Sequence, residues 1–153
     1  MENLNRYHLV QVIHEIVEKG TPFLGICLGL QILFERSEES PGVEGLGLLK
    51  GEILRIPDKE GLKIPHMGWN SIHLQNEGRL FKGISQESYV YFVHSYYLKA
   101  EEEEIIKATT EYSTHIHASV EKGNLFACQF HPEKSSDLGL AILKNFAEIG
   151  EED

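Results

Sequence analysis

The sequence predicts a mixed α/β protein with one three-layer core. Apolar residues at three- and four-residue spacing predict a helix at each end of the chain. A short apolar run, Pro22–Cys27, is typical of a buried parallel strand and passes directly into a helix-forming segment. Further runs downstream, separated by turn residues, have the composition of strands. The 153 residues, 41% of them hydrophobic, suffice for a single domain over residues 1–153 and are too few for two.

The first expected element is an amphipathic helix over Glu2–Lys19, and Gly20 follows as a residue that commonly ends a helix. The strand Pro22–Cys27 leads into a second helix, Leu28–Arg36, which stops before a polar loop. Six strands are then expected: Gly51–Ile56, Trp69–Leu74, Tyr89–Leu98, Ile105–Thr110, His115–Val120 and Leu125–Phe130.

The last element is a helix over Asp137–Ile149, because Leu138, Ile142 and Phe146 recur one turn apart. The acidic end after it is expected to fray. The acidic run Glu101–Glu104 is most simply a solvated hairpin tip.

Charge and composition exclude several classes of protein. The chain carries 14 basic and 24 acidic residues, so its net charge of −10 disfavours binding to nucleic acid or to an anionic membrane. No apolar run reaches the roughly 20 residues that span a bilayer, and the start lacks a signal-peptide pattern, so a cytoplasmic protein is expected. Cys27 and Cys128 are expected to be free thiols. His115 and His117 lack further ligands at suitable spacing, so no metal site is expected.

Cys27 lies between two glycines in the sequence Gly25-Ile26-Cys27-Leu28-Gly29, at the predicted junction of strand and helix. A nucleophile elbow needs small neighbours at such a tight, strained turn. The start of the helix would favour the thiolate, and the backbone N–H of Leu28 would point at a developing oxyanion. The alternative is a small core thiol, which is common in proteins.

A second motif, His131-Pro132-Glu133, follows the last predicted strand. Residues two apart at a strand end share a face, so Glu133 could hold His131 in the tautomer that accepts a proton from Cys27. Alone, this motif would more simply be a surface turn. Together with the elbow it satisfies the roles of a covalent acyl-transfer triad.

These two motifs, in "PFLGICLGLQILFE" and "QFHPEKS", closely resemble the triad-type, class I glutamine amidotransferases. The stretches Lys63–Ile72, "KIPHMGWNSI", and Tyr89–Leu98, "YVYFVHSYYL", are more narrowly similar to the glutaminase subunits of imidazole glycerol phosphate synthases. The resemblance implies a three-layer, flavodoxin-like fold with a mixed, mostly parallel central sheet. It implies hydrolysis of the glutamine amide through a thioester on Cys27, without a cofactor. The ammonia would pass to a (β/α)₈-barrel cyclase that is the partner in a heterodimer of histidine biosynthesis.

The resemblance also assigns residues. It implies that Gln31 and Glu39 hold the amino-acid end of glutamine, although a solvated helix residue and a loop carboxylate are the plain alternatives. It implies that backbone groups of Ser95 and Tyr96 contact the substrate. The segment with His66, Trp69 and Asn70 would face the cyclase, with Trp69 as an anchor or, alternatively, as a core residue.

The family pattern includes a front segment, with oxyanion donors, that precedes the residues matched here. We therefore expect a fold that is truncated at the N-terminus and a chain with little glutaminase activity by itself. Two alternatives stay open: a catalytically deficient member that keeps only partner binding, and an amidotransferase subunit of another pathway.

Overall fold

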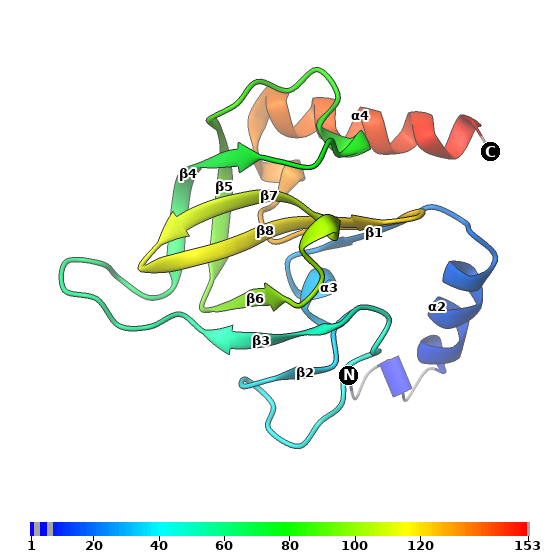
Figure 1. Ribbon diagram of the computed structural model, residues 1–153, viewed down its shortest axis with the longest axis horizontal. Coiled ribbons are helices and arrows are strands. Elements are labelled where there is room, and N and C mark those ends of the chain that lie inside the picture. Colours follow the sequence, from blue (N-terminus) through cyan, green and yellow to red (C-terminus); the bar gives the residue numbers. More distant parts are fainter. Residues whose placement is uncertain (2–3, 6–7, 153) are drawn as a thin grey trace.

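A computed structural model describes residues 1, 4–5 and 8–152 of the chain, and it confirms the α/β class (Figure 1). The largest element is a six-stranded sheet with the strand order β1-β9-β8-β7-β4-β5. Its strands are β1 (Phe23–Ile26), β9 (Leu125–Cys128), β8 (Thr114–Lys122), β7 (Ile106–Tyr112), β4 (His66–Leu74) and β5 (Ser88–His94). A second sheet has the order β2-β3-β6, from β2 (Arg36–Ser37), β3 (Gly51–Arg55) and β6 (Tyr96–Ala100).

The expected mostly parallel pairing is present in only two ladders of the described strands. β1 pairs with β9, and β2 with β3, in parallel, whereas the other ladders are antiparallel. The reason is local: β7 and β8 are joined through Ser113 alone, and β8 and β9 through two residues, and such short connections permit only antiparallel neighbours. The sheet is therefore mixed, as the sequence predicts, and β4 and β5 turn steeply out of the plane of β7 and β8 (Figure 1).

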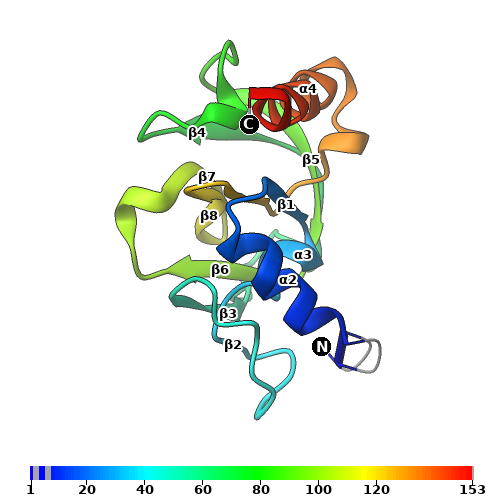
Figure 2. The same ribbon diagram turned by 90° about the vertical axis from the view of Figure 1, so that its right-hand side faces the viewer.

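Two of the helices cover opposite sides of this frame (Figure 2). The helix α4 (Ser136–Glu152) lies on one side of the six-stranded sheet and contributes the buried Ile142 and Ile149. The helix α2 (Leu9–Glu18) lies on the other side, near the short helix α3 (Leu28–Gln31). Further helical turns are the 3-10 segments η1 (Arg79–Phe81), η2 (Glu103–Ile105) and η3 (Pro132–Lys134). No helix in the described part of the chain is long and apolar enough to cross a membrane.

Two apolar clusters make up the core, one on each side of the six-stranded sheet. The first joins α4 to residues of β4, β5 and β8, including Ile72, Phe92 and Ala118. The second fills the space between the two sheets and α3, around Leu30, Phe34 and Ile53. One face of α2 packs against the second cluster through Val10, Ile13 and Val17, which explains the apolar spacing of that segment.

Both terminal helices are present, but the first is interrupted at His8, which has a left-handed backbone conformation with a φ of 57°. The helix expected over Glu2–Lys19 is present over Leu9–Glu18, and residues 2–3 and 6–7 of the prediction lie outside the described residues. Gly20 follows it with a φ of 78°, as expected of a residue that ends a helix. The C-terminal helix runs from Ser136 to Glu152, past the predicted end at Ile149.

The second predicted helix, Leu28–Arg36, is wrong in its length because α3 ends at Gln31. The carbonyl groups of residues 32–34 accept hydrogen bonds from a later loop: Leu46 N–H donates to Ile32 O, and Leu49 N–H to Leu33 O. A helix that continued would need these acceptors for its own next turn. Arg36 instead begins strand β2.

The strand predicted over Tyr89–Leu98 is two strands, because the chain leaves one sheet at Ser95 and enters the other. The acidic run Glu101–Glu104 is consequently not a hairpin tip: it connects β6 to β7, which belong to different sheets. Within this connection Glu102 forms an ion pair with Lys122 on β8. Strand β4 begins at His66, three residues before the predicted start.

Candidate active site

The predicted strand, turn and helix around Cys27 are present. Cys27 has a φ of 54° and a ψ of −104° between β1 and α3, a conformation that a non-glycine residue adopts only when its surroundings impose it. Its N–H donates to Cys128 O at 2.7 Å, and its carbonyl accepts from Leu30 N–H at 3.0 Å. Hydrogen bonds on both sides therefore hold the strained turn that presents the thiol.

The surroundings of the Cys27 thiol act on its pKa in opposite directions. Burial raises this pKa above its ordinary value, whereas hydrogen bonds from the Leu28 backbone N–H and the Gln129 side chain lower it. The charges of Glu133 and Glu39 raise it again. The Leu28 N–H at the start of α3 therefore favours the thiolate, as expected, but burial outweighs it and the net shift of the pKa is upward. The four residues of α3 supply too little helix for a large dipole.

His131 and Glu133 form the predicted pair. Nδ1 of His131 lies 2.5 Å from Oε1 of Glu133, so Nε2 is the ring nitrogen left for proton transfer. The local structure differs from the expected strand end, because β9 stops at Cys128 and Pro132 begins the 3-10 turn η3. Ser135 Oγ donates to His131 O at 2.6 Å and fixes the backbone of this turn.

The fold brings Cys27 and His131 to the same end of the six-stranded sheet. Ile26 and Cys128 are register partners in the parallel ladder of β1 and β9, so both strands point their carboxyl ends the same way. Both residues then contact the free edge of β5. The Cys27 Sγ lies 3.7 Å from Val93 O, and His131 N–H donates to Tyr91 O at 2.9 Å. Carbonyls two residues apart on a strand share one edge, so β5 anchors the two side by side.

Two of the four predicted substrate residues line a pocket, and the other two lie outside it. A pocket of about 540 Å³ is lined by Leu28, Gln31 and Glu39, together with neighbours from Met1 to Gly45. Ser95 and Tyr96 lie outside its lining, at the junction of β5 and β6, and their carbonyls are engaged within the fold. Ser95 O accepts from Ile56 N–H at 2.9 Å, and Tyr96 O accepts from Gln31 Nε2 at 3.1 Å.

Gln129 belongs to this site, although the sequence analysis did not single it out. Its side chain is fully buried, and its Nε2 lies 3.5 Å from Cys27 Sγ. Its Oε1 accepts from Gln31 Nε2 at 3.2 Å. The sequence signal that could have found it is an amide in an otherwise apolar stretch, two residues before His131.

Comparison with known proteins adds to this geometry. The family described as "Glutamine amidotransferase class-I" matches residues 3–149. The chain belongs to this family. It is also 53% identical over 149 residues to imidazole glycerol phosphate synthase subunit HisH of Moorella thermoacetica, a match that covers 97% of this chain and 70% of that one. The HisH subunit of Methanocaldococcus jannaschii is 50% identical over 149 residues, 97% of this chain and 74% of the relative.

Solved structures agree with this fold. A glutamine amidotransferase structure matches with a TM-score of 0.70 at 19% identity, over 97% of this chain and 71% of that chain. A glutamine amidotransferase from Thermotoga maritima matches with a TM-score of 0.61 at 22% identity, over 96% and 56% of the two chains. These similarities show the shared fold of the class I amidotransferases.

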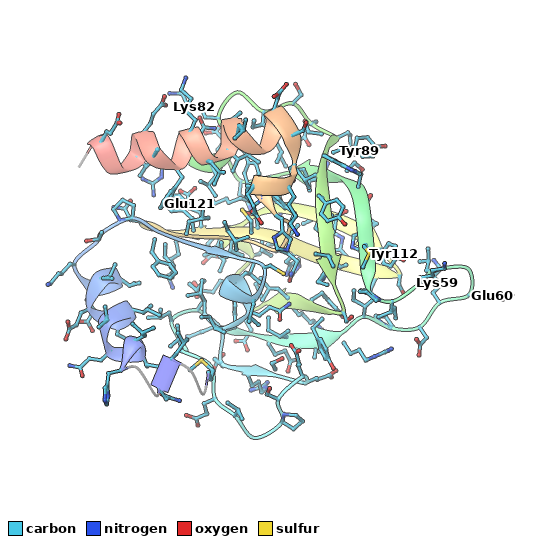
Figure 3. The ribbon with its side chains drawn as sticks, turned by 180° about the vertical axis from the view of Figure 1, so that it is seen from behind. Lys59, Glu60, Lys82, Tyr89, Tyr112 and Glu121 are labelled. Carbon is cyan, nitrogen blue, oxygen red and sulfur yellow. The ribbon has the colours of Figure 1, made fainter. Side chains whose placement is uncertain are left out.

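The predicted partner-facing residues on strand β4 of this amidotransferase differ in their exposure to solvent. Trp69 is 53% exposed, so the alternative of a core tryptophan is wrong. Met67 and Tyr89 are also largely exposed, and Figure 3 shows Tyr89 at the outer surface beside this strand. His66, in contrast, is buried and contributes almost nothing to the surface of the protein. Alternation along the strand explains the difference, because residues 66 and 69 lie on opposite faces.

The buried His66 belongs to a second polar group in the amidotransferase core. Its ring stacks between Phe92 and Tyr112, with centroid distances of 4.7 and 3.9 Å. Nδ1 of His66 lies 3.0 Å from Nε2 of His94, and Asn70 Nδ2 lies 3.4 Å from Nε2 of His66. Burial lowers the pKa of both histidines to about 4, so both rings are neutral at pH 7.

The remaining candidate ligands are engaged elsewhere. His117 Nδ1 accepts a hydrogen bond from Ala100 N–H, and His115 contacts Glu111. No group of three or more His, Cys, Asp or Glu side chains in the described residues could hold a metal ion. Cys128 is fully buried, and burial raises the pKa of its thiol to about 12, which fits the small core residue that the sequence predicts.

Proposed function

We propose that the protein is the glutaminase subunit of an imidazole glycerol phosphate synthase. It hydrolyses the side-chain amide of glutamine and supplies the ammonia to a cyclase that makes imidazole glycerol phosphate in histidine biosynthesis. One observation carries this proposal: Cys27 on its strained turn and the His131–Glu133 pair meet at the edge of β5. The identity of about half to HisH subunits, over nearly the whole chain, supports the choice of pathway.

Cys27, His131 and Glu133 divide the chemistry among them. At rest the thiol is protonated, and its S–H donates to Val93 O. When glutamine binds, Nε2 of His131 accepts the thiol proton while the sulfur attacks the amide carbon. His131 then returns the proton to the leaving nitrogen, so ammonia departs and a γ-glutamyl thioester remains on Cys27. A water molecule, deprotonated by the same nitrogen, cleaves the thioester to glutamate and restores the thiol.

Two further groups assist the triad. Glu133 holds the Nδ1–H of His131 and stabilises the imidazolium that forms when the thiol proton arrives. The Leu28 N–H, the first backbone donor after the turn, stabilises the negative oxygen of the tetrahedral intermediate. Glutamine would occupy the pocket with Leu28, Gln31 and Glu39, where the Glu39 carboxylate pairs with the substrate ammonium. The contact of Ser95 and Tyr96 backbone groups with the substrate stays a prediction, because both residues lie outside the lining of this pocket.

The exposed face of β4 and β5 is the docking surface for the cyclase. Met67, Trp69 and Tyr89 are each more than half exposed, and the Tyr91 ring lies edge-on to Trp69 at 6.0 Å. Large aromatic side chains of this kind carry most of the binding energy in many interfaces. Asn70 lies on the same strand, on the opposite face beside His66. The partner is a (β/α)₈ barrel, and the heterodimer works as a lyase in the cytoplasm.

Glutamate release in the presence of the cyclase tests this function. Cys27→Ala and His131→Ala should each lose at least ~10³-fold in turnover, because the triad acts as a unit. A glutamine analogue that alkylates thiols should modify Cys27 and block the reaction. Near-normal turnover by Cys27→Ala would refute the mechanism. Tight binding to the cyclase without any glutamate release would instead identify a member that only binds its partner.

A further inference from the structure

A buried amide that has no role in the mechanism above touches the reacting sulfur. Gln129 has no exposed surface, and its backbone N–H donates to Ala118 O at 2.8 Å, which fixes it beside β8. Nε2 of Gln129 lies 3.5 Å from Cys27 Sγ, and Oε1 lies 3.2 Å from Nε2 of Gln31. Both ends of the amide are therefore engaged, one of them with the nucleophile.

The partners of Gln31 decide which end of Gln129 faces the sulfur. A backbone carbonyl only accepts hydrogen bonds, so Tyr96 O requires that Gln31 present its NH₂ group. The second hydrogen of that NH₂ group then points to Gln129, which must offer its oxygen. The N–H of Gln129 is thereby left for Cys27. A reversed Gln129 amide would place an oxygen against the sulfur and repel its negative charge.

A second set of hydrogen bonds holds the Tyr96 carbonyl oxygen in place. Tyr96 O also receives a hydrogen bond from Nδ1 of His94 at 2.8 Å, and Nε2 of His94 pairs with His66. The direction of these hydrogen bonds follows because a backbone carbonyl only accepts: His94 must carry its proton on Nδ1. Its Nε2 therefore accepts from Nδ1–H of His66. Because both rings are buried and neutral, this tautomer persists at pH 7.

We propose that Gln129 is a further catalytic residue of this site. Its Nε2–H donates to Cys27 Sγ and stabilises the thiolate while the thiol proton passes to His131, and no bond of Gln129 breaks in this step. Gln31 is the positioning residue that keeps the N–H, and not the amide oxygen, against the sulfur. This inference rests on the proposed role of Cys27 as the nucleophile.

The surroundings of the Cys27 sulfur explain why the Gln129 N–H donor would matter for the reaction. Burial, the Glu133 charge from η3 and the Glu39 charge from the loop after β2 all oppose a thiolate. The groups that favour a thiolate are the Leu28 N–H and Gln129. The two histidines of this region, His131 and His94, add no negative charge. Once the thioester has formed, the sulfur is neutral and its bond to Gln129 weakens, so the donor acts where charge develops.

The rate of Cys27 alkylation by iodoacetamide, followed against pH by mass spectrometry, measures this effect directly. Gln129→Met preserves the length of the side chain and removes the donor. We expect the midpoint of the alkylation profile to rise by about one pH unit, and kcat for glutamate release to fall about tenfold with a smaller change in KM. Gln129→Glu retains the acceptor for Gln31 but places a carboxylate at the sulfur, so a larger rise is expected.

Two more variants separate this role from a structural one. Gln31→Met leaves Gln129 in place but frees its amide to reverse, so the midpoint should rise by less than in Gln129→Met. Ser119→Ala is the matched control, because it removes a buried hydrogen bond of 2.7 Å to Ala127 O in the neighbouring strands. It should lower the melting temperature and leave the alkylation midpoint unchanged. Cys128, fully buried with a raised pKa, does not react in this range.

The outcomes are distinct. A folded Gln129→Met protein with the wild-type alkylation midpoint and kcat overturns the inference. If Gln129→Met does not fold, a wild-type midpoint in both Gln129→Glu and Gln31→Met overturns it in the same way. Failure of the proposed function gives another result: Cys27→Ala would still release glutamate, whatever Gln129 does to the reactivity of the thiol.

Discussion

Gly25→Ala tests whether the turn at Cys27 depends on close backbone contact. A Cβ atom at position 25 would lie 2.5 Å from Gly29 O, 2.7 Å from Gly29 C and 3.1 Å from Leu30 N. These are backbone atoms of α3, so no side chain can rotate away. Because non-bonded carbon contacts have their optimum near 3.5 Å, α3 must move by about 1 Å.

This displacement has two expected costs. Overpacking of this kind destabilises a protein by about 1–3 kcal/mol. The start of α3 carries the Leu28 N–H, and a shift of about 1 Å in a catalytic group costs turnover by about 100-fold. The assay combines the free energy of unfolding in urea with glutamate release in the presence of the cyclase. We expect both quantities to fall in Gly25→Ala.

Gly29→Ala is the matched control from the same motif. A Cβ atom at Gly29 would meet nothing within 4 Å, and alanine favours the helical conformation that Gly29 adopts. Its free energy of unfolding should equal or slightly exceed that of the wild type. The reasoning is refuted if Gly25→Ala retains wild-type stability and turnover, or if the two variants lose stability equally.

Three other changes give measurable outcomes. Trp69→Ala should weaken binding to the cyclase by about 2 kcal/mol or more in a titration. The unfolding free energy should stay nearly unchanged, because the side chain is 53% exposed. A destabilised free subunit with normal affinity for the cyclase would contradict this prediction. His66 and His94 have pKa values near 4 in the folded protein, below the ordinary 6.5, so between these pH values the unfolded chain binds more protons. The unfolding free energy should therefore be fully present above pH 6.5 and fall as the pH drops toward 4, and equal values at pH 7.5 and 5 would exclude this linkage. Glu133→Gln should lose less turnover than His131→Ala, because the base remains and only its orientation and charge stabilisation are lost; equal losses would show that Glu133 does more than orient the ring.

The sequence alone determined the features that depend on neighbours along the chain. The turn between Gly25 and Gly29 is local, because small residues on both sides of Cys27 are the signature of a strained strand-to-helix junction. The pairing of His131 with Glu133 is local as well, since the two lie only two positions apart and either a strand end or a 3-10 turn brings them together. The periodic apolar face of α4 needed only the spacing of its own side chains. The roles of the triad residues stay predictions from these motifs.

Only the tertiary structure decided the features whose partners lie far away in the sequence. Helix α3 ends at Gln31 because a loop some fourteen to sixteen residues later occupies its next carbonyls, as the bonds of Leu46 and Leu49 show. Gln129 reaches Cys27 across 102 positions of sequence. A local pattern cannot indicate such a contact, because the folded sheet, and not the chain, makes these residues neighbours.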